Sequence, residues 1–259
     1  MNGRHIFLTR VAFIAALLLF WESLARSGLF YEDVIPPLRE VGGALASVVA
    51  TADFYAHLGW TALEVAFALG IGAAFGVAVG LALGANVFIR RAYEPYVYYL
   101  GATPKLVFFP VMIMWFGVGP SSKVALAAVA CFFPIALATL AGVGELNQTF
   151  VKVGRSFRAS AWQMATNIYF PALRGPILTG LRLGFGLAAV VTLLAETKLS
   201  NQGLGFLVIQ AFTVFDIPRM YALLITTFTL AIAMNMVLSR LEDASSGRSG
   251  FGRANAKRL

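Results

Sequence analysis

Long apolar runs separated by short polar intervals make up most of this chain. A helix needs about 20 apolar residues to cross the hydrocarbon core of a membrane, and six runs approach or exceed that length. They cover residues 6–25, 65–89, 95–116, 124–144, 177–195 and 220–239. The pattern therefore predicts an all-α membrane protein with six transmembrane helices.

The first run, residues 6–25, has two interpretations. Its uncharged centre is short, so Arg10 and Glu22 would have to extend toward opposite membrane interfaces. A cleaved signal peptide would show the same basic start, apolar middle and small-x-small sequence, here at residues 23–25. We expect a retained helix, because a protein with five further spans needs no cleaved leader.

The second and fifth runs carry glycines at every fourth position, which places them on one face of a helix. In lipid, such a stripe lets another backbone approach closely. The residues are Gly72, Gly76, Gly80, Gly84, Gly180 and Gly184. We predict tight helix packing along both stripes.

In the third run, residues 95–116, Lys105 lies between Pro104 and Pro110. Prolines free backbone carbonyls, which membrane-embedded structure tolerates only against protein or water. An ionisable residue at this depth marks a functional site by default. Lys105 either faces a solute pathway, with Phe109 and Met112 as further candidate pathway residues, or reaches the cytoplasmic interface from a broken helix.

Polar material outside the runs is scarce. Residues 38–50 have apolar positions at helical spacing, which fits a helix on the membrane surface or one packed on the bundle. The chain ends in a polar, basic stretch, residues 241–259, that we expect to be a flexible cytoplasmic tail. These features divide the chain into an N-terminal helix with a periplasmic segment (residues 1–56), a transmembrane domain (57–240) and the tail.

The basic residues indicate the orientation. Thirteen of the 20 Lys and Arg residues fall on one side of the six spans, five fall on the other side, Lys123 among them, and Lys105 and Arg182 lie within spans. Because cytoplasmic loops carry the excess of Lys and Arg, both termini are predicted to be cytoplasmic. The net charge of +8 therefore reflects topology in a chain surrounded by membrane lipid, and nucleic acid is not an expected partner.

Composition excludes several classes of protein. One cysteine and two histidines exclude a thiolate or multi-histidine metal centre, so no metal site is expected, and no GxxxxGK[ST] sequence exists for ATP binding. An intramembrane enzyme is disfavoured and no catalytic residue is expected, because no predicted span holds a histidine and no G-x-S-x-G sequence occurs. An ATP-independent channel or secondary transporter is the alternative. It would need more membrane-buried acids than Glu64 and Glu94, which the spans place near interfaces.

The one long interval that is both polar and basic lies between the fourth and fifth runs. This connector, residues 144–176, carries four cations against one acid, Glu145. Phe150, Val153 and Phe157 are spaced at i, i+3 and i+7, so a first short helix would have one apolar face. The connector is either a docking surface for a soluble partner or an amphipathic loop on anionic lipid headgroups.

A second short helix in the connector is predicted from a capping box. Ser160 and Gln163 have the S-x-x-Q spacing whose side chains satisfy the first free amides of a helix. We expect this helix to run to Phe170, where Pro171 limits its continuation. The two helices would meet at Arg158.

The connector and the runs beside it resemble the inner-membrane permeases of ABC importers. The cytoplasmic signature of that family reads EAA, a glycine, nine residues and then I-x-L-P, and the sequence at 168–171 lies at the matching distance from Arg158. The resemblance covers residues 57–240 and includes a third-span pattern similar to ATPKLVFFPVMIMWFGVGPSSK. It is closest to the subgroup that imports nitrate, taurine and aliphatic sulfonates. The connector positions that fit are Arg155, Ala159, Ser160, Trp162, Gln163 and Pro171.

Two connector positions depart from the signature. Lys152 stands in place of the signature glutamate, and Arg158 stands in place of the glycine between the two helices. If that turn requires a positive φ, arginine costs about 1 kcal/mol relative to glycine. The resemblance implies that this loop enters a groove on an ATP-binding subunit, and the two cations suggest a groove more acidic than usual. The implied coupling residues are Lys152, Arg155, Ser156, Arg158, Ala159, Ser160, Trp162 and Gln163.

The resemblance implies a multi-pass permease subunit with a type I ABC-importer fold in the bacterial inner membrane. It would form a homodimer, dock two ATP-binding cassette subunits and receive solute from a periplasmic solute-binding protein. ATP and Mg would bind to the partner subunits, so this chain would hold no cofactor. The subgroup and Lys105 favour a small anionic solute, sulfonate-, taurine- or nitrate-like, that crosses by alternating access.

Overall fold

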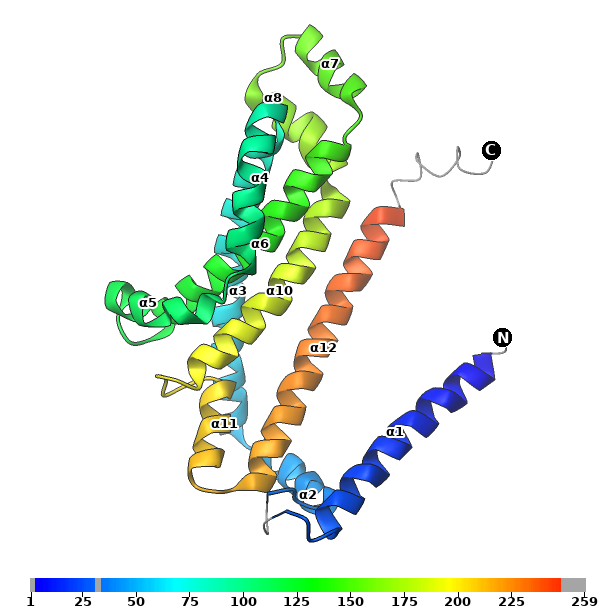
Figure 1. Ribbon diagram of the computed structural model, residues 1–259, viewed down its shortest axis with the longest axis vertical. Helices are drawn as coiled ribbons and strands as arrows, with labels where there is room; N and C mark the ends of the chain where they lie inside the picture. The colour runs from blue at the N-terminus through cyan, green and yellow to red at the C-terminus, as the bar shows by residue number, and fades with distance from the viewer. Residues whose placement is uncertain (1–2, 31–33, 248–259) are drawn as a thin grey trace. The chain divides into compact units, whose positions relative to one another are not determined.

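A computed structural model describes residues 3–30 and 34–247, and every regular element within these ranges is a helix (Figure 1). In chain order the elements are α1 (Gly3–Arg26), α2 (Leu38–Val49), α3 (Ala52–Gly84), α4 (Val87–Ala102), the 3₁₀ helix η1 (Lys105–Phe108), α5 (Phe109–Phe116), α6 (Pro120–Glu145), α7 (Gln148–Ser156), α8 (Ala161–Met164), the π-helix η2 (Ala165–Tyr169), α9 (Phe170–Ala172), α10 (Arg174–Glu196), α11 (Leu204–Thr213) and α12 (Ile217–Gly247).

The predicted apolar runs are all helical. Helices α1, α3, α6, α10 and α12 are each long and apolar enough to cross a membrane. The third run forms α4 and the η1–α5 segment, which together pass the same test but bend by 81° at the break between them. The prediction of an all-α membrane protein is therefore confirmed, and the third span is a broken one, as its prolines indicated.

The chain forms two compact units. Of the described residues, those up to Trp60 form the first unit together with residues 202–229, and residues 61–201 form the second together with residues 230–247. The N-terminal boundary lies close to the one expected at residue 56. In contrast, residues 202–229 group with the N-terminal part and not with the rest of the domain that we expected to cover 57–240.

In the first unit, the C-terminal end of α1 is anchored by polar and aromatic contacts. The Trp21 indole donates a hydrogen bond to the Pro36 carbonyl at 3.0 Å, and its ring meets Tyr221 edge-on at 5.1 Å. The Glu22 carboxylate accepts a hydrogen bond from the Leu38 N–H at 3.0 Å. The described side chains before Trp21 are exposed, as expected of a helix surrounded by lipid.

The first unit also holds α2 and the beginning of α3. Helix α2 buries Val41 and Val48, which favours a packed helix over one that only lies on a membrane surface. The His57 Nδ1 atom accepts a hydrogen bond from the Gly203 N–H at 2.9 Å, and the His57 ring stacks on Phe206 at 5.6 Å. The start of α3 is therefore joined to the start of α11.

Helix α6 is the centre of the second unit, and Figure 1 shows α10 running beside it. The packing glycines of two neighbouring helices face α6. A Cβ added to Gly80 would lie 2.7 Å from the Ala136 carbonyl oxygen, and one added to Gly184 would lie 2.9 Å from Ile135 Cδ1. Both distances are too short for a real side chain. The glycines in contact with α6 are Gly72, Gly76, Gly80 and Gly84 of α3 and Gly180 and Gly184 of α10.

Helix α12 is longer than the sequence suggested. We expected a flexible tail from residue 241, but α12 continues to Gly247, and this part of the prediction is wrong. The reason is a polar contact with α10: Glu242 accepts a hydrogen bond from Thr179 and forms an ion pair with Arg182 at 3.1 Å. Residues 248–259 of the expected tail lie outside the described residues.

Candidate functional site

The connector folds into two short helical segments separated by a tight turn. Helix α7 begins after Asn147, whose side-chain oxygen accepts a backbone N–H at 2.9 Å. At its other end, the Arg158 N–H donates to the Arg155 carbonyl at 2.9 Å and the Ala159 N–H donates to the Gly154 carbonyl at 3.1 Å. This pair of bonds is a Schellman motif, in which a glycine usually takes the left-handed position.

Arg158 occupies that left-handed position, with φ of 52°. The signature has glycine at this position, and an arginine is energetically costly there only if the turn requires a positive φ. The structure shows that it does. A left-handed residue other than glycine or asparagine costs about 1–2 kcal/mol. The turn therefore holds local strain, which the two Schellman bonds and the packed helices on either side offset.

The predicted capping box is confirmed. The Ser160 N–H donates to Gln163 Oε1 at 2.8 Å, and the Gln163 N–H donates to Ser160 Oγ at 3.2 Å. The helix that follows is irregular, because α8 widens into the π-helix η2 before α9. Pro171 therefore lies inside α9 and does not end the helix at Phe170.

The inner face of the connector is a small apolar core. Val151 of α7, Met164 of α8 and Leu173 are buried together. A Cβ added to Gly154 would lie 2.5 Å from the Met164 sulfur atom, so α7 and α8 approach each other closely at this point. Because this core joins the two segments, the connector is a structured unit and not a loose loop.

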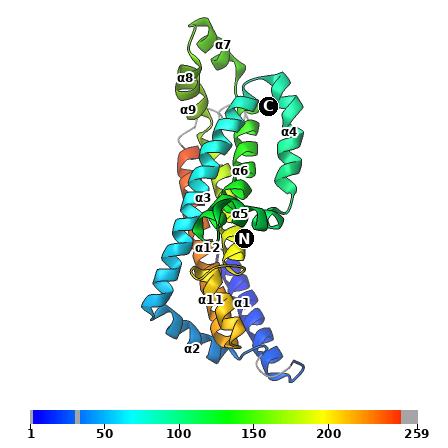
Figure 2. The same cartoon turned by 90° about the vertical axis from the view of Figure 1, so that its left-hand side faces the viewer.

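The outer face of the connector combines apolar and cationic side chains. Phe157 is 83% exposed and Trp162 is 74% exposed, and Phe150 and Val153 are exposed beside them. The apolar positions that suggested one face of a first helix therefore point outward, while the inward positions are Val151 and Gly154. Figures 1 and 2 show α7 and α8 at one end of their unit. We define the outer face as Phe150, Lys152, Val153, Arg155, Phe157, Arg158 and Trp162, all of which are exposed.

The remaining candidate coupling residues lie within or beside the same helices. The Ser156 hydroxyl donates to the Lys152 carbonyl at 2.9 Å, so its polar group is engaged inside α7. Ala159 is half-buried under the turn, and Gln163 is exposed except for its capping bond. The eight residues thus form one continuous segment around the Arg158 turn.

Lys105 lies at the break between α4 and η1. Its ammonium group donates to the carbonyls of Leu100 at 2.8 Å and Thr103 at 2.9 Å, and it also contacts the Gly101 carbonyl. The Phe133 ring centroid lies 4.7 Å from Nζ, a cation–π distance. The lysine therefore donates hydrogen bonds to backbone carbonyls at and just after the C-terminal end of α4.

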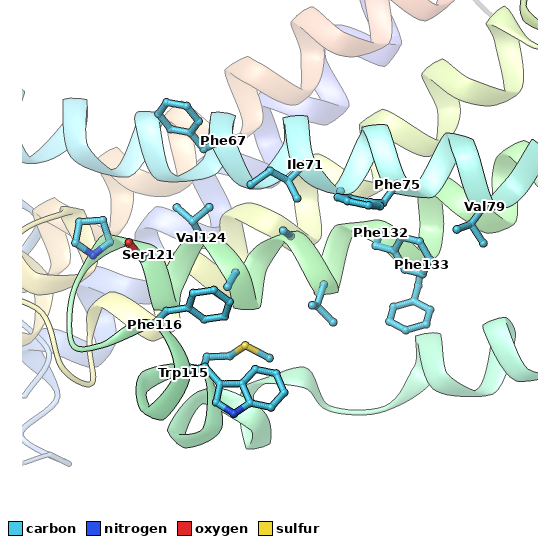
Figure 3. Close-up of a pocket in the computed structure, with 16 residues that line it drawn as sticks. Phe67, Ile71, Phe75, Val79, Trp115, Phe116, Ser121, Val124, Phe132 and Phe133 are labelled. Carbon is cyan, nitrogen blue, oxygen red and sulfur yellow. The ribbon is translucent and has the colours of Figure 1, made fainter.

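Phe109 and Met112, the other candidate pathway residues, are both buried in α5. Met112 lines an apolar cavity of about 930 Å³ that is bounded by α3, α5 and α6 (Figure 3). Its wall includes Phe75 of α3, Trp115 of α5 and Phe133 of α6. Phe133 thus contributes to the cavity wall and also contacts Lys105.

A buried polar cluster in the same unit was missed from the sequence. Lys123 was counted among exterior cations and Glu64 was placed near an interface, but their side chains are only 1% and 2% exposed and form an ion pair at 2.6 Å. Glu196, at the end of α10, is fully buried beside them and accepts a hydrogen bond from Thr61 at 2.7 Å. The sequence did contain a signal for this cluster. Because successive spans cross the membrane in opposite directions, the three charged residues lie on the same side of the membrane.

Comparison with known proteins agrees with the arrangement of helices. A protein-family model described as "binding-protein-dependent transport system inner membrane component" matches residues 70–248. The taurine transport system permease protein TauC of Escherichia coli K12 is 32% identical over 203 residues, which cover 76% of this chain and 74% of that protein. The putative aliphatic sulfonates transport permease protein SsuC of the same organism is 25% identical, and the match covers 87% of this chain and 83% of that protein.

Among solved structures, a bacterial alginate ABC transporter in complex with an alginate pentasaccharide-bound periplasmic protein has a similar fold. The TM-score is 0.60, and the match covers 95% of this chain and 96% of that chain at 12% sequence identity. At this identity the likeness concerns the fold alone.

Proposed function

This chain belongs to the family of binding-protein-dependent transport system inner-membrane components, which are multi-pass permease subunits of ABC importers, and on that premise we propose that its connector couples ATP hydrolysis in separate subunits to solute passage. The observation that carries the proposal is the outer face of the connector. It exposes large apolar side chains and cations on two helices that a buried core holds in a fixed arrangement.

The composition of the outer face suits a protein groove with an acidic rim. Burying a fully exposed phenylalanine or tryptophan is worth about 1.5–3 kcal/mol, so Phe157 and Trp162 would supply most of the binding energy. Lys152, Arg155 and Arg158 surround them and would pair with carboxylates of the partner, which mainly sets specificity and association rate.

The proposed partners that bind and hydrolyse ATP are separate subunits. This chain has no P-loop sequence, so ATP and Mg would be bound by two docked ATP-binding cassette subunits, which would also carry out hydrolysis. Closure of those subunits would move the connectors as rigid bodies and switch the pathway between its two accessible sides. The permease itself would perform no covalent chemistry.

Two further partners complete the proposed importer. A second copy of this chain would form a homodimer around the pathway, since two-fold dimers are the commonest closed assemblies of identical chains. A periplasmic solute-binding protein would deliver the solute. The alginate transporter whose fold is similar was solved with such a periplasmic protein, which supports this part of the proposal.

The proposed solute is a small organic anion. The support is the 32% identity with a permease named for taurine and the further similarity to one named for aliphatic sulfonates. Lys105 would attract an anion toward the pathway, although its ammonium group already donates to carbonyls of the α4 end.

Charge reversal on the outer face tests the coupling role. We expect the double variant Lys152→Glu/Arg158→Glu, in vesicles with its ATP-binding subunits and solute-binding protein, to lose at least about tenfold in uptake per ATP hydrolysed. Arg91→Glu is the matched control, because Arg91 is an exposed cation on α4, outside the connector. Unchanged coupling in the double variant would refute the proposal.

Truncation of the apolar anchors tests the docking energy separately. Phe157→Ala should weaken association of the ATP-binding subunit by about tenfold or more, since about 1.4 kcal/mol corresponds to a factor of ten. Phe88→Ala is the control, because Phe88 is equally exposed on α4. Equal association of both variants would assign docking to another surface.

Uptake by the purified chain alone, driven by an ion gradient, would instead support the ATP-independent transporter.

The solute class is tested at Lys105. If Lys105 attracts an anion, Lys105→Ala should lower the preference for an anionic over a neutral analogue, and Lys105→Arg should retain it. A purely structural brace would lower uptake of both solutes alike and lower Tm. Unchanged uptake and preference in an assembled Lys105→Ala complex would show that Lys105 does not select the solute.

A further inference from the structure

A cavity beside the broken third span combines an apolar wall with a cationic side chain. Its volume is about 570 Å³, and it is bounded by η1, α5 and the two residues 198 and 199 that follow α10. Lys198 is its charged lining residue, and none of the described residues that line it is acidic. The apolar wall consists of Leu106, Val107, Phe109, Pro110, Ile113 and Leu199.

The cavity lies at the end of the second unit that is remote from the connector. The connector leads into the start of α10, whereas Lys198 and Leu199 come after its last residue. Helix α10 has 23 residues and is therefore about 35 Å long. If the connector faces the cytoplasm, as the proposed function requires, this cavity is near the external side, from which an imported solute enters.

Lys198 is available to bind an anion directly, whereas Lys105 is not. An ammonium group has three N–H donors, and Lys105 directs its own to three backbone carbonyls around the end of α4. The Lys198 side chain is exposed, and among the described residues it forms no hydrogen bond or ion pair. An anion in this cavity would therefore meet a cation whose donors are not already used.

The composition of the cavity suits an organic anion that carries an aliphatic chain. Ligand sites typically measure about 300–1,000 Å³ and are mostly apolar, with a few charged groups that fix the orientation of the ligand. An anion without an apolar part would lose hydration against this wall and gain little from it. We propose that the cavity holds the aliphatic chain of an organic anion while its charged end pairs with Lys198. This inference rests on the proposed function and narrows the class of its solute.

The larger apolar cavity lined by Met112 fits such an anion less well. None of the described residues that line it is charged, so an anion bound there would lack a partner for its charge. Of these two cavities, the one lined by Lys198 therefore offers the better match to both ends of the ligand.

Titration of the full chain in phosphatidylcholine nanodiscs, followed by ligand-observed NMR, tests the proposal. The probes are linear alkanesulfonates, and empty nanodiscs correct for partition into lipid. We expect the dissociation constant to fall about two- to fourfold for each methylene added between ethanesulfonate and hexanesulfonate, because a fully buried CH₂ group strengthens binding about fourfold. Equal affinity across the series would refute the proposal.

Substitution of Lys198 tests the charged end of the ligand. Lys198→Ala should weaken hexanesulfonate binding about threefold, as expected for an exposed ion pair, and leave binding of neutral hexanol unchanged. Lys198→Arg should retain the wild-type affinity. Arg91→Ala is the control, because Arg91 is an exposed cation that does not line the cavity. Unchanged affinity in Lys198→Ala, or a loss in Lys105→Ala only, would overturn the proposal.

Substitution of the wall tests the aliphatic end. Leu199→Asn should reduce the gain in affinity per methylene, whereas Val118→Asn should not, because Val118 is also exposed but lies outside the cavity. The same gain in both variants would show that the chain binds elsewhere. Displacement of the sulfonates by phosphatidylglycerol in the nanodisc would assign the cavity to a membrane lipid and equally refute a solute site.

The titration is independent of the coupling proposal. It uses neither ATP nor partner subunits, so uncoupled transport in vesicles would leave the binding result intact. Conversely, absence of sulfonate binding would leave the role of the connector untouched.

Discussion

Replacing Arg158 by glycine should stabilise the connector, although the change removes a cation from the proposed docking surface. The residue holds φ of 52° in the Schellman motif at the end of α7. A left-handed conformation costs a residue with a Cβ about 1–2 kcal/mol, and glycine avoids that cost. Glycine also gives up about 0.4–1 kcal/mol because it is more flexible in the unfolded state. The net gain is about 0.7 kcal/mol.

Hydrogen exchange of the connector amides measures this gain. An increase of about 0.7 kcal/mol in the free energy of local opening corresponds to about threefold slower exchange. The matched control is Arg158→Ala, which removes the guanidinium group but keeps the Cβ and its strain. Because the Arg158 side chain is exposed, we expect the alanine variant to exchange like the wild type.

The difference between the two variants decides whether the turn is strained. If glycine and alanine exchange at the same rate, the positive φ at residue 158 carries no strain and the predicted gain does not exist. If both exchange faster than the wild type, the guanidinium group stabilises the turn through a contact whose energy exceeds that of the strain.

The remaining predictions concern packing and capping. Gly80→Ala should cost about 1–3 kcal/mol and lower Tm, because its Cβ would lie 2.7 Å from a backbone oxygen of α6. Gly70→Ala has nothing within 4 Å, so it should leave Tm unchanged or raise it, and equal losses would show that close contact with α6 is not the cause. Ser160→Ala should cost about 1 kcal/mol and speed amide exchange in α8, because it removes the capping bond. Ser156→Ala is its control, since that hydroxyl bonds within its own helix, and equal exchange would show that the capping box contributes nothing.

The sequence predicted the local structure of the connector, but it did not predict which face of the first connector helix is exposed. The capping box at Ser160 and the left-handed turn at Arg158 depend on a few neighbouring residues, so spacing alone could predict them. The spacing of Phe150, Val153 and Phe157 also indicates a helical face. It cannot say whether that face points inward or outward, because a protein that docks a partner leaves apolar side chains exposed.

The buried cluster shows a second limit of sequence reasoning. Lys123 and Glu64 lie near the ends of apolar runs, where single-span rules place charges in the aqueous interface. Only the packing of three helices reveals that they are covered. Membrane-buried acids were expected of an ATP-independent transporter. Because Glu64 and Glu196 are buried, the number of buried acids does not distinguish that class from an ABC-importer permease. The family match over residues 70–248, and not the acid count, identifies the class of protein.

The glycine contacts along α6 determine how force can travel through its unit. Interfaces made of long side chains absorb small displacements by rotamer changes, whereas the glycines let α3 and α10 pack closely on α6 and leave less of this freedom. Helix α6 has 26 residues and is therefore about 39 Å long, with the connector after one end and Lys123 in the first turn of the other. A displacement of the connector should therefore be transmitted along α6 toward the far side of the membrane, with α3, α6 and α10 moving together as a rigid body.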